Sequence, residues 1–513
     1  MEGFCNTFCD RCWSSSEIDW MTKGEGYGVK FAGALSFLFK RRDKGPSMTL
    51  QINAWIITSG LLLTIGANGA NGQTAAPGQK KTEERSAAKI PIQQFTLKNG
   101  LRVVLSEDHS APTYSICVTY DAGSRDEKPG HTGFAHLFEH MMFQGSENVG
   151  KGEHFILIEN NGGGMNGTTN TDRTNYFETL PANQLDLGLF LEADRMKSLA
   201  VTQANLDNQR NAVQEERRLR VDNQPYGKTS EAISDTAYDN FGYKHSTIGS
   251  MADLNAASLD ELKDFFRIYY APNNAVLALV GDFRKDEALV KIKKYFEEIP
   301  SQPAPARPDL TEPPQTAERR KSVEDGFAQV PRIDIVYKIP SYNSPDYMPL
   351  NVLMSILGSG QSSRLYQELV KDKQLAANVF ANAAARRATG LASVIALVRP
   401  GVKMEEVEKS VYEQVGKVRN EPVTDWELEK VRLKYRHEHA AQLSSTLTRA
   451  VQLAYYTVAW NDPEVLNSEE SRLDAVTKED LLRVAKTYLL ATNRSVITTL
   501  PKSKAAAGET GGN

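Results

Sequence analysis

The sequence predicts an α+β fold of two domains, each a mixed β-sheet packed with helices. Three observations lead to this prediction. At 513 residues, the chain is too long for a single hydrophobic core. Apolar runs typical of strands alternate with helical patterns in two stretches, 93–300 and 331–500. A segment with six prolines, residues 299–320, separates them, so 301–330 is expected to be an interdomain linker.

The first domain is expected to begin with a β-hairpin. Phe95–Leu97 and Leu101–Leu105 are apolar runs on either side of Asn99-Gly100, a dipeptide that favours a tight turn. The alternation of strand and helix then continues to the end of the domain. Its clearest further elements are strands at Ser115–Tyr120 and Val276–Val280 and a helix at Lys285–Glu298.

The second domain is expected to have the same kind of composition, although no sequence repeat relates it to the first. The tail 501–513 is rich in Gly and Ala and is expected to be disordered. Strands are predicted at Ile333–Ile339, Gly390–Val398 and Ser495–Leu500, and helices at Tyr347–Gly358, Arg364–Lys371, 403–418, 424–442 and 473–490.

Residues 1–72 are expected to contain a secretory signal, preceded by an N-terminal extension that does not belong to the working protein. A basic cluster precedes the apolar run Ala54–Ala67, and small residues follow it, with possible cleavage after Gly69 or Gly72. The run is shorter than a bilayer span, although an uncleaved anchor is the alternative. Met48 stands where a signal peptide would begin, which makes 1–47 an over-extended start. Residues 73–92 are expected to be a polar linker. The signal predicts an exported, periplasmic protein.

Residues 131–145, HTGFAHLFEHMMFQG, contain the most informative pattern in the chain. His136, Glu139 and His140 form an H-x-x-E-H motif inside an apolar run that predicts a buried helix. Positions i and i+4 share a helix face, so both imidazoles can reach one metal ion, with Glu139 beside them. This motif is typical of one class of zinc peptidases. Two core histidines with an unrelated glutamate are the alternative.

A third metal ligand is expected, because catalytic zinc typically has three protein ligands. The helical segment Ala204–Asn223 contains Glu215 and Glu216, and Glu216 falls within an apolar stripe. A carboxylate there needs a partner, which a metal would supply. A salt bridge to Arg220, four residues further on, is the alternative. The stripe is formed by Leu206, Ala212, Val213 and Leu219.

Several longer segments resemble the pitrilysin/insulinase family of zinc metallopeptidases. They are GFAHLFEHMMFQGS, GGGMNGTTNTDRTNYFETLP, NQRNAVQEERR with NQPYG, YYAPNNAVLALVGDF and, in the second domain, LGSGQSSRLYQELV. The resemblance covers 93–500 and is closest to the short bacterial and mitochondrial-processing-peptidase branch. It implies a catalytic N-terminal domain, 93–300, and an inactive C-terminal domain, 331–500, that face each other across a cavity.

The resemblance also implies the roles of the motif residues. His136, His140 and Glu216 would bind one Zn²⁺ per chain, and Glu139 would be the general base. The implied activity is that of a zinc endopeptidase acting on peptides or unfolded segments. A zinc hydrolase of another substrate on an unrelated fold is an alternative. A net charge of −4 gives no reason to expect nucleic acid as a partner.

The segment Gly162–Thr171 corresponds in the family to a strand at a sheet edge, to which the substrate adds as a further strand. Its matching positions are Asn166, Gly167, Thr168 and Thr169. Backbone pairing of this kind tolerates many peptide sequences, because the hydrogen bonds do not depend on the peptide's side chains. A glycine-rich turn before an ordinary strand is the alternative.

One departure from the family pattern bears on partners. Active members pair an arginine with a tyrosine from the second domain or from a partner subunit. Arg386 and Arg387 lie in the matching region, but Ser393 and Val394 stand where the tyrosine is expected. A homodimer, or a heterodimer with an inactive homologue, would complete such a site. A non-catalytic binding or assembly subunit is the alternative function.

Overall fold

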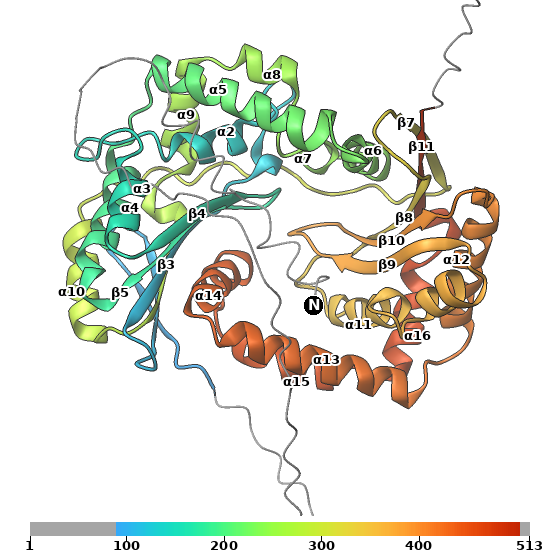
Figure 1. The fold of residues 1–513 in the computed structure, drawn as a ribbon. Helices are drawn as coiled ribbons and strands as arrows, with labels where there is room; N and C mark the ends of the chain where they lie inside the picture. The colour runs from blue at the N-terminus through green and yellow to red at the C-terminus, as the bar shows by residue number, and fades with distance from the viewer. Residues whose placement is uncertain (1–88, 503–513) are drawn as a thin grey trace, which may run out of the picture. The chain divides into compact units, whose positions relative to one another are not determined.

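The computed structural model describes residues 89–502, which form two β-sheets with their helices (Figure 1). The signal and extension predicted for 1–72, most of the predicted linker 73–92 and the tail after Lys502 lie outside the described residues. Within 89–502, no helix is both long and apolar enough to cross a membrane.

The first sheet has six strands in the order β1-β2-β6-β3-β5-β4. Its first two strands form the predicted hairpin, with Phe95 opposite Val103 in antiparallel register. Gly100 has a φ of 85° in the connecting turn, a conformation that glycine adopts at little cost. Strand β4 lies at one edge of the sheet. The strands are β1 (Gln93–Thr96), β2 (Arg102–Glu107), β3 (Thr113–Tyr120), β4 (Gly164–Thr169), β5 (Thr174–Pro181) and β6 (Ala275–Gly281).

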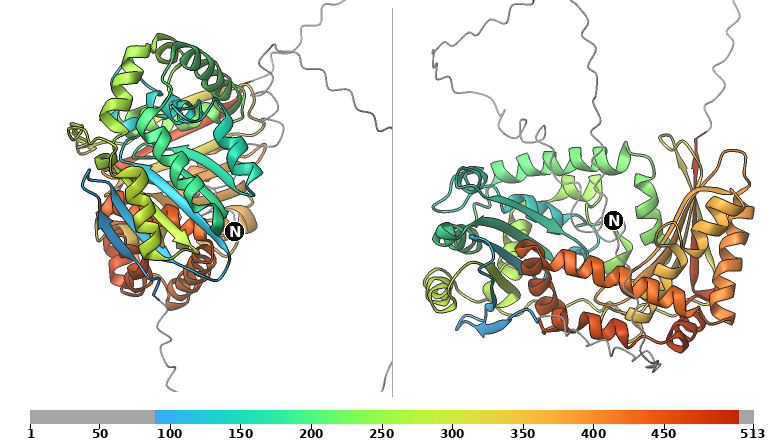
Figure 2. Two further views of the ribbon diagram at one scale, coloured as in Figure 1. Left: turned by 90° about the vertical axis from the view of Figure 1, so that its left-hand side faces the viewer. Right: turned by 60° about the horizontal axis from the view of Figure 1, so that its bottom comes forward.

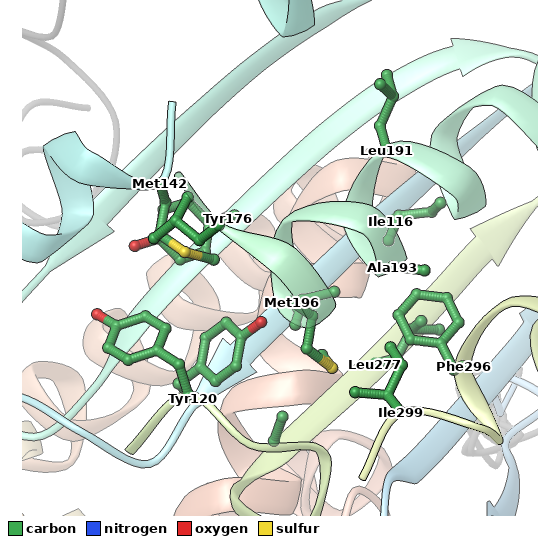
Figure 3. Packing of buried hydrophobic residues seen from close by; sticks show 14 of the residues in the cluster. Ile116, Tyr120, Met142, Tyr176, Leu191, Ala193, Met196, Leu277, Phe296 and Ile299 are labelled. Carbon is green, nitrogen blue, oxygen red and sulfur yellow. The ribbon is translucent and has the colours of Figure 1, made fainter. Parts of the chain in front are cut away.

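One face of this sheet is buried under helices from the same half of the chain. Alternate side chains of β3 and β5, such as Tyr120 and Tyr176, pack against Met142 and Met196 (Figure 3). In this half of the chain, α6 packs instead on the second sheet. The helices of this half are α2 (Phe134–Met141), α3 (Glu153–Asn160), α4 (Leu185–Ser198), α5 (Gln203–Arg217), α6 (Gly227–Ala237), α7 (Phe241–Lys244), α8 (Met251–Ala256), α9 (Leu259–Tyr269) and α10 (Lys285–Phe296), with short helical turns at η1 (Ser124–Asp126), η2 (Ala182–Gln184), η3 (Arg218–Asp222) and η4 (Pro272–Asn274).

The opposite face of the first sheet is covered by α14 (Thr446–Trp460), a helix from near the C-terminus. Ala450, Leu453 and Ala454 pack there against Cys117 and Ala278 of the sheet. The sequence predicted helices at 403–418, 424–442 and 473–490, so this helix was missed. Its Thr and Val residues have low helix propensity, and packing against strands far away in the chain offsets that cost.

The second sheet has five strands in the order β7-β11-β8-β10-β9. Strand β7 lies within the segment 301–330, which was predicted as a linker, and pairs in parallel with β11. The sequence of β7, RRKSVED, is polar because this edge strand is mostly exposed, and it therefore lacks an apolar signal. The strands are β7 (Arg319–Asp325), β8 (Arg332–Ile339), β9 (Ala376–Ala384), β10 (Gly390–Val398) and β11 (Arg494–Pro501).

Helices also pack on the second sheet and form its core. The helix predicted at Tyr347–Gly358 is confirmed, while the one at Arg364–Lys371 is mostly a π-helical turn. Figure 2 shows the same elements from two further directions. The helices are α11 (Tyr347–Gly358), α12 (Met404–Asn420), α13 (Asp425–Leu443), α15 (Val465–Asp474) and α16 (Lys478–Tyr488), with turns at η5 (Tyr366–Asp372) and η6 (Ala491–Asn493).

A buried arginine organises the charges where the two halves of the chain meet. Arg125 has 1% of its side chain exposed. Its guanidinium donates to Asp121 at 2.6 Å and to the carboxylate of Asp172 at 3.1 Å, and Asp126 lies 3.6 Å from its Nε. The charges of Arg125 and Arg387 outweigh burial and lower the pKa of Asp121. The cavity expected between the domains stays a prediction.

Candidate metal centre

The H-x-x-E-H motif lies on α2, as predicted from the sequence. Phe134, Leu137, Phe138 and Met141 of this helix are buried in the first core, which fixes the helix and turns its polar side outward. The two histidines, one helical turn apart, have ring centroids separated by 4.9 Å. A rigid apolar helix therefore presents both imidazoles on one face.

Glu216 reaches the two histidines from α5, which packs against α2. Its Oε2 lies 3.5 Å from His136 Nε2 and 3.2 Å from His140 Nε2. Ligand atoms bound at about 2.1 Å around one tetrahedral cation would lie roughly 3.4 Å apart. The structure thus brings together the three residues predicted as ligands, in an arrangement that could hold one metal ion.

The charges in this group suit a cation. Burial raises the pKa of Glu216, but His136, His140 and Arg220 outweigh it and lower that pKa to about 2. Burial lowers the pKa of His136, which keeps its imidazole neutral and able to bind metal. Burial also acts on His140, but the hydrogen bond and charge of Glu216 prevail and raise its pKa. A charged carboxylate and a neutral imidazole are therefore already in place.

Gln209 is a residue of this centre that the sequence did not reveal. Its Oε1 lies 3.3 Å from His140 Nδ1, so it can accept a hydrogen bond from Nδ1–H and favour the tautomer whose Nε2 lone pair is free for a metal ion. Gln209 precedes Glu216 by seven residues, two helical turns on the same face of α5. That spacing is the signal that could have identified it.

Glu139 lies between the metal-ligand candidates and the edge strand β4. A Cβ added to Gly167 of β4 would stand 3.2 Å from Glu139 Cγ, so the strand passes directly beside this side chain. Within the described part of the chain, the buried Oε2 of Glu139 has no hydrogen-bond partner. A buried carboxylate oxygen without a partner is suited to accept a proton or to hold a water molecule.

Strand β4 offers its backbone at the free edge of the first sheet. The hydroxyls of Thr168 and Thr169 bond to the side chains of Asn175 and Thr174 on β5, the only strand paired with β4 in the described part of this sheet. The amide of Gly167 donates to the side chain of its own neighbour, Asn166, at 2.8 Å. The edge position predicted for this strand is confirmed. An extended peptide could form hydrogen bonds with the backbone groups at this edge.

The apolar stripe predicted on α5 holds for Leu206, Ala212 and Val213, which are buried, but is wrong for Leu219. Leu219 is 62% exposed. The α-helix ends at Arg217, and the π-helical turn η3 follows, so the side-chain directions no longer repeat every 3.6 residues. Glu215 points away from the centre, as predicted, and pairs with Arg218.

Neither arginine considered as a catalytic partner is available for that role. Arg387 donates to both oxygens of Asp121 at 2.8 Å and to the carbonyl of Val458 at 2.9 Å. The guanidinium of Arg386 lies over the rings of Tyr238 and Tyr243, 4.8 and 4.7 Å from their centroids. Both residues join the two halves of the chain.

A second buried group, His154, Glu178 and Glu192, also has donor atoms close together. Arg195 pairs with Glu192 and supplies a positive charge there. Burial raises the pKa of Glu178 well above its usual value, so a proton neutralises it. The negative charge of this group is thus balanced by Arg195 and by that proton.

Two family models match the chain. "Insulinase (Peptidase family M16)" matches residues 102–250, and "Peptidase M16 inactive domain" matches residues 256–435. The zinc protease PqqE of Helicobacter pylori is 31% identical over 444 residues, which are 86% of this chain and 97% of the relative. The chain belongs to the M16 peptidase family. This result confirms the resemblance to pitrilysin and insulinase.

Other M16 members agree in sequence and in fold. A probable mitochondrial-processing peptidase subunit beta of Arabidopsis thaliana is 23% identical, over 77% of this chain and 75% of its own length. The crystal structure of a protease from Helicobacter pylori matches with a TM-score of 0.77 and 31% identity, covering 80% of this chain and all of that one. The two-domain α+β prediction is therefore confirmed.

Proposed function

We propose that this protein is a zinc-dependent endopeptidase that cleaves peptides or unfolded segments. The observation that carries the proposal is the convergence of His136, His140 and Glu216 from two helices, beside Glu139 and the free edge of β4. Zinc protease relatives support the same class of activity.

Each residue of the centre would have a separate role in hydrolysis. His136, His140 and Glu216 would hold Zn²⁺, which when bound polarises a carbonyl and lowers the pKa of water toward 7. Glu139 would take the proton of the attacking water and pass it to the leaving amine. Gln209 would keep the His140 ring in the tautomer that binds metal.

The substrate would add to β4 as a seventh strand of the sheet. Its carbonyl would replace the Asn166 side chain as the acceptor for the Gly167 amide, which places the peptide next to Glu139. Of the four predicted positions Asn166, Gly167, Thr168 and Thr169, the alternate residues Gly167 and Thr169 would then contribute backbone groups. Selectivity for sequence would be low, and extended or unfolded chains would be preferred.

The test is hydrolysis of an internally quenched peptide by the purified protein, with and without a chelator. Cleavage should stop with the chelator and return with Zn²⁺. Cleavage that continues in a chelated, metal-free sample would contradict the proposal.

Gly167 gives a sharper test of the β4 assignment. An alanine there would put a methyl group 3.1–3.3 Å from Tyr176, Glu139 and Phe143, closer than side chains tolerate without moving. If a clash of about 1–3 kcal/mol disturbs the strand where the peptide binds, kcat/KM should fall by roughly 5- to 150-fold. Gly164→Ala on the same strand is the control, because its methyl group would meet nothing within 4 Å. Equal activity of the two variants would show that β4 is not the substrate strand.

A non-catalytic assembly subunit is the second candidate function. It is favoured by the engagement of Arg386 and Arg387 in contacts within the chain. For the endopeptidase itself, a homodimer or a heterodimer with an inactive homologue would supply the missing arginine and tyrosine. Export to the periplasm is proposed from the signal-like residues 1–72.

A further inference from the structure

We propose that Arg220 is a positioning residue that restricts Glu216 to a single metal-facing oxygen. This inference rests on the proposed zinc site and adds to it a residue that sets the coordination number. The sequence suggested a salt bridge to Arg220 and a metal as alternative partners of Glu216. The geometry points to both partners at the same time, with Arg220 on one oxygen of Glu216 and the metal ion on the other.

The two oxygens of Glu216 have separate partners. Oε2 faces the histidines, 3.2 Å from His140 Nε2 and 3.5 Å from His136 Nε2. Oε1 lies 2.8 Å from a guanidinium nitrogen of Arg220. The carboxylate is thus held in one orientation by an ion pair on the side away from the histidines.

The pair has little value as a stabilising contact alone. Arg220 is 46% exposed, and exposed helical i,i+4 pairs contribute only about 0.3–0.5 kcal/mol. The ion pair instead affects the orientation of Glu216. A cation 2.8 Å from Oε1 limits rotation of the carboxylate plane. A role in orientation therefore fits the geometry better than a role in stability.

The backbone that carries Arg220 is held in an unusual shape. It lies in the π-helical turn Arg218–Asp222, and such turns are frequent at functional sites. Close to its end, Tyr226 has a φ of 62°, a left-handed conformation that is costly for a residue with a side chain. The Tyr226 amide donates to Asp325 at 2.6 Å, and its hydroxyl to Val330. Contacts with the second half of the chain thus hold this segment in place.

The consequence concerns how many positions remain free on the metal. Two imidazoles and one carboxylate oxygen make three ligands, which leave a fourth position for water in a tetrahedral centre. If Glu216 rotated to offer both oxygens, the centre would gain a ligand and its positive charge would be further neutralised. The metal would then be a weaker Lewis acid. Arg220 prevents that rotation.

The experiment replaces zinc by Co²⁺, whose visible absorption is severalfold stronger in four-coordinate than in five-coordinate centres. Arg220→Met is compared with Arg218→Met, a control on the same turn that is also 46% exposed and pairs with Glu215. We expect Arg220→Met to bind one Co²⁺ with absorption reduced by half or more. Arg218→Met should match the parent protein, and Arg220→Lys should restore part of the signal.

The outcomes separate this inference from the proposed function. If Arg220→Met binds Co²⁺ with an unchanged spectrum, the inference is wrong and the zinc site stands. If the parent protein binds no Co²⁺, the proposed function and the inference both fail. Equal loss of absorption in Arg218→Met and Arg220→Met would also contradict the role of Arg220, because it would reflect the turn as a whole.

Discussion

Glu139→Gln is expected to reduce kcat for peptide hydrolysis by about 10²–10⁴-fold, the usual contribution of a general base. The amide has nearly the same shape as the carboxylate but cannot take a proton from water. The buried Oε2 of Glu139 bonds to none of the residues that the structure describes, so the exchange should leave the fold intact. Peptide cleavage and zinc content would be measured on the same preparation.

Glu215→Gln is the matched control, since Glu215 lies on α5 but is exposed and faces away from the histidines. It should retain the parent kcat. Full activity of Glu139→Gln with bound zinc would remove Glu139 from the mechanism. Loss of zinc along with activity would instead assign it a role in metal binding.

Arg125→Ala is expected to lower the free energy of unfolding by about 3–5 kcal/mol, the cost of removing one partner from a buried charged network. Asp121 and Asp172 would both lose the buried cation with which they pair. Because the pKa of Asp121 is lowered by folding, its stabilising contribution is present at neutral pH and is lost in acid. Urea unfolding at neutral pH measures the effect.

Arg307→Ala provides the comparison. Arg307 also pairs with Asp121, at 2.8 Å, but is 35% exposed, so its removal should cost below about 1 kcal/mol. Asp121 would keep Arg125 and Arg387 as partners. Similar losses in Arg125→Ala and Arg307→Ala would show that burial of Arg125 does not control the stability of this network.

Much of the centre could be predicted because its residues follow short periodic rules. His136 and His140 are one turn apart on a helix, and Glu216 interrupts an otherwise apolar stripe. These patterns are local, so a single helix contains each of them. The hairpin around Gly100 was predictable for the same reason.

The features that the sequence did not reveal depend on partners far away in the chain. Helix α14 is stabilised by packing on β3 and β6, strands of the first sheet, and the polar strand β7 by its pairing with β11. Leu219 was placed in the core because a regular helix was assumed, whereas the chain changes to a π-helical turn. Gln209 acts through His140, and its signal in the sequence is its position two helical turns before Glu216 on the same helix.

The most direct measurement is zinc-edge anomalous diffraction from crystals of the protein loaded with one equivalent of Zn²⁺. We predict a single zinc per chain, bonded at about 2.0–2.2 Å to His136 Nε2, His140 Nε2 and Glu216 Oε2. Zinc bound elsewhere, or no anomalous signal between α2 and α5, would contradict the account.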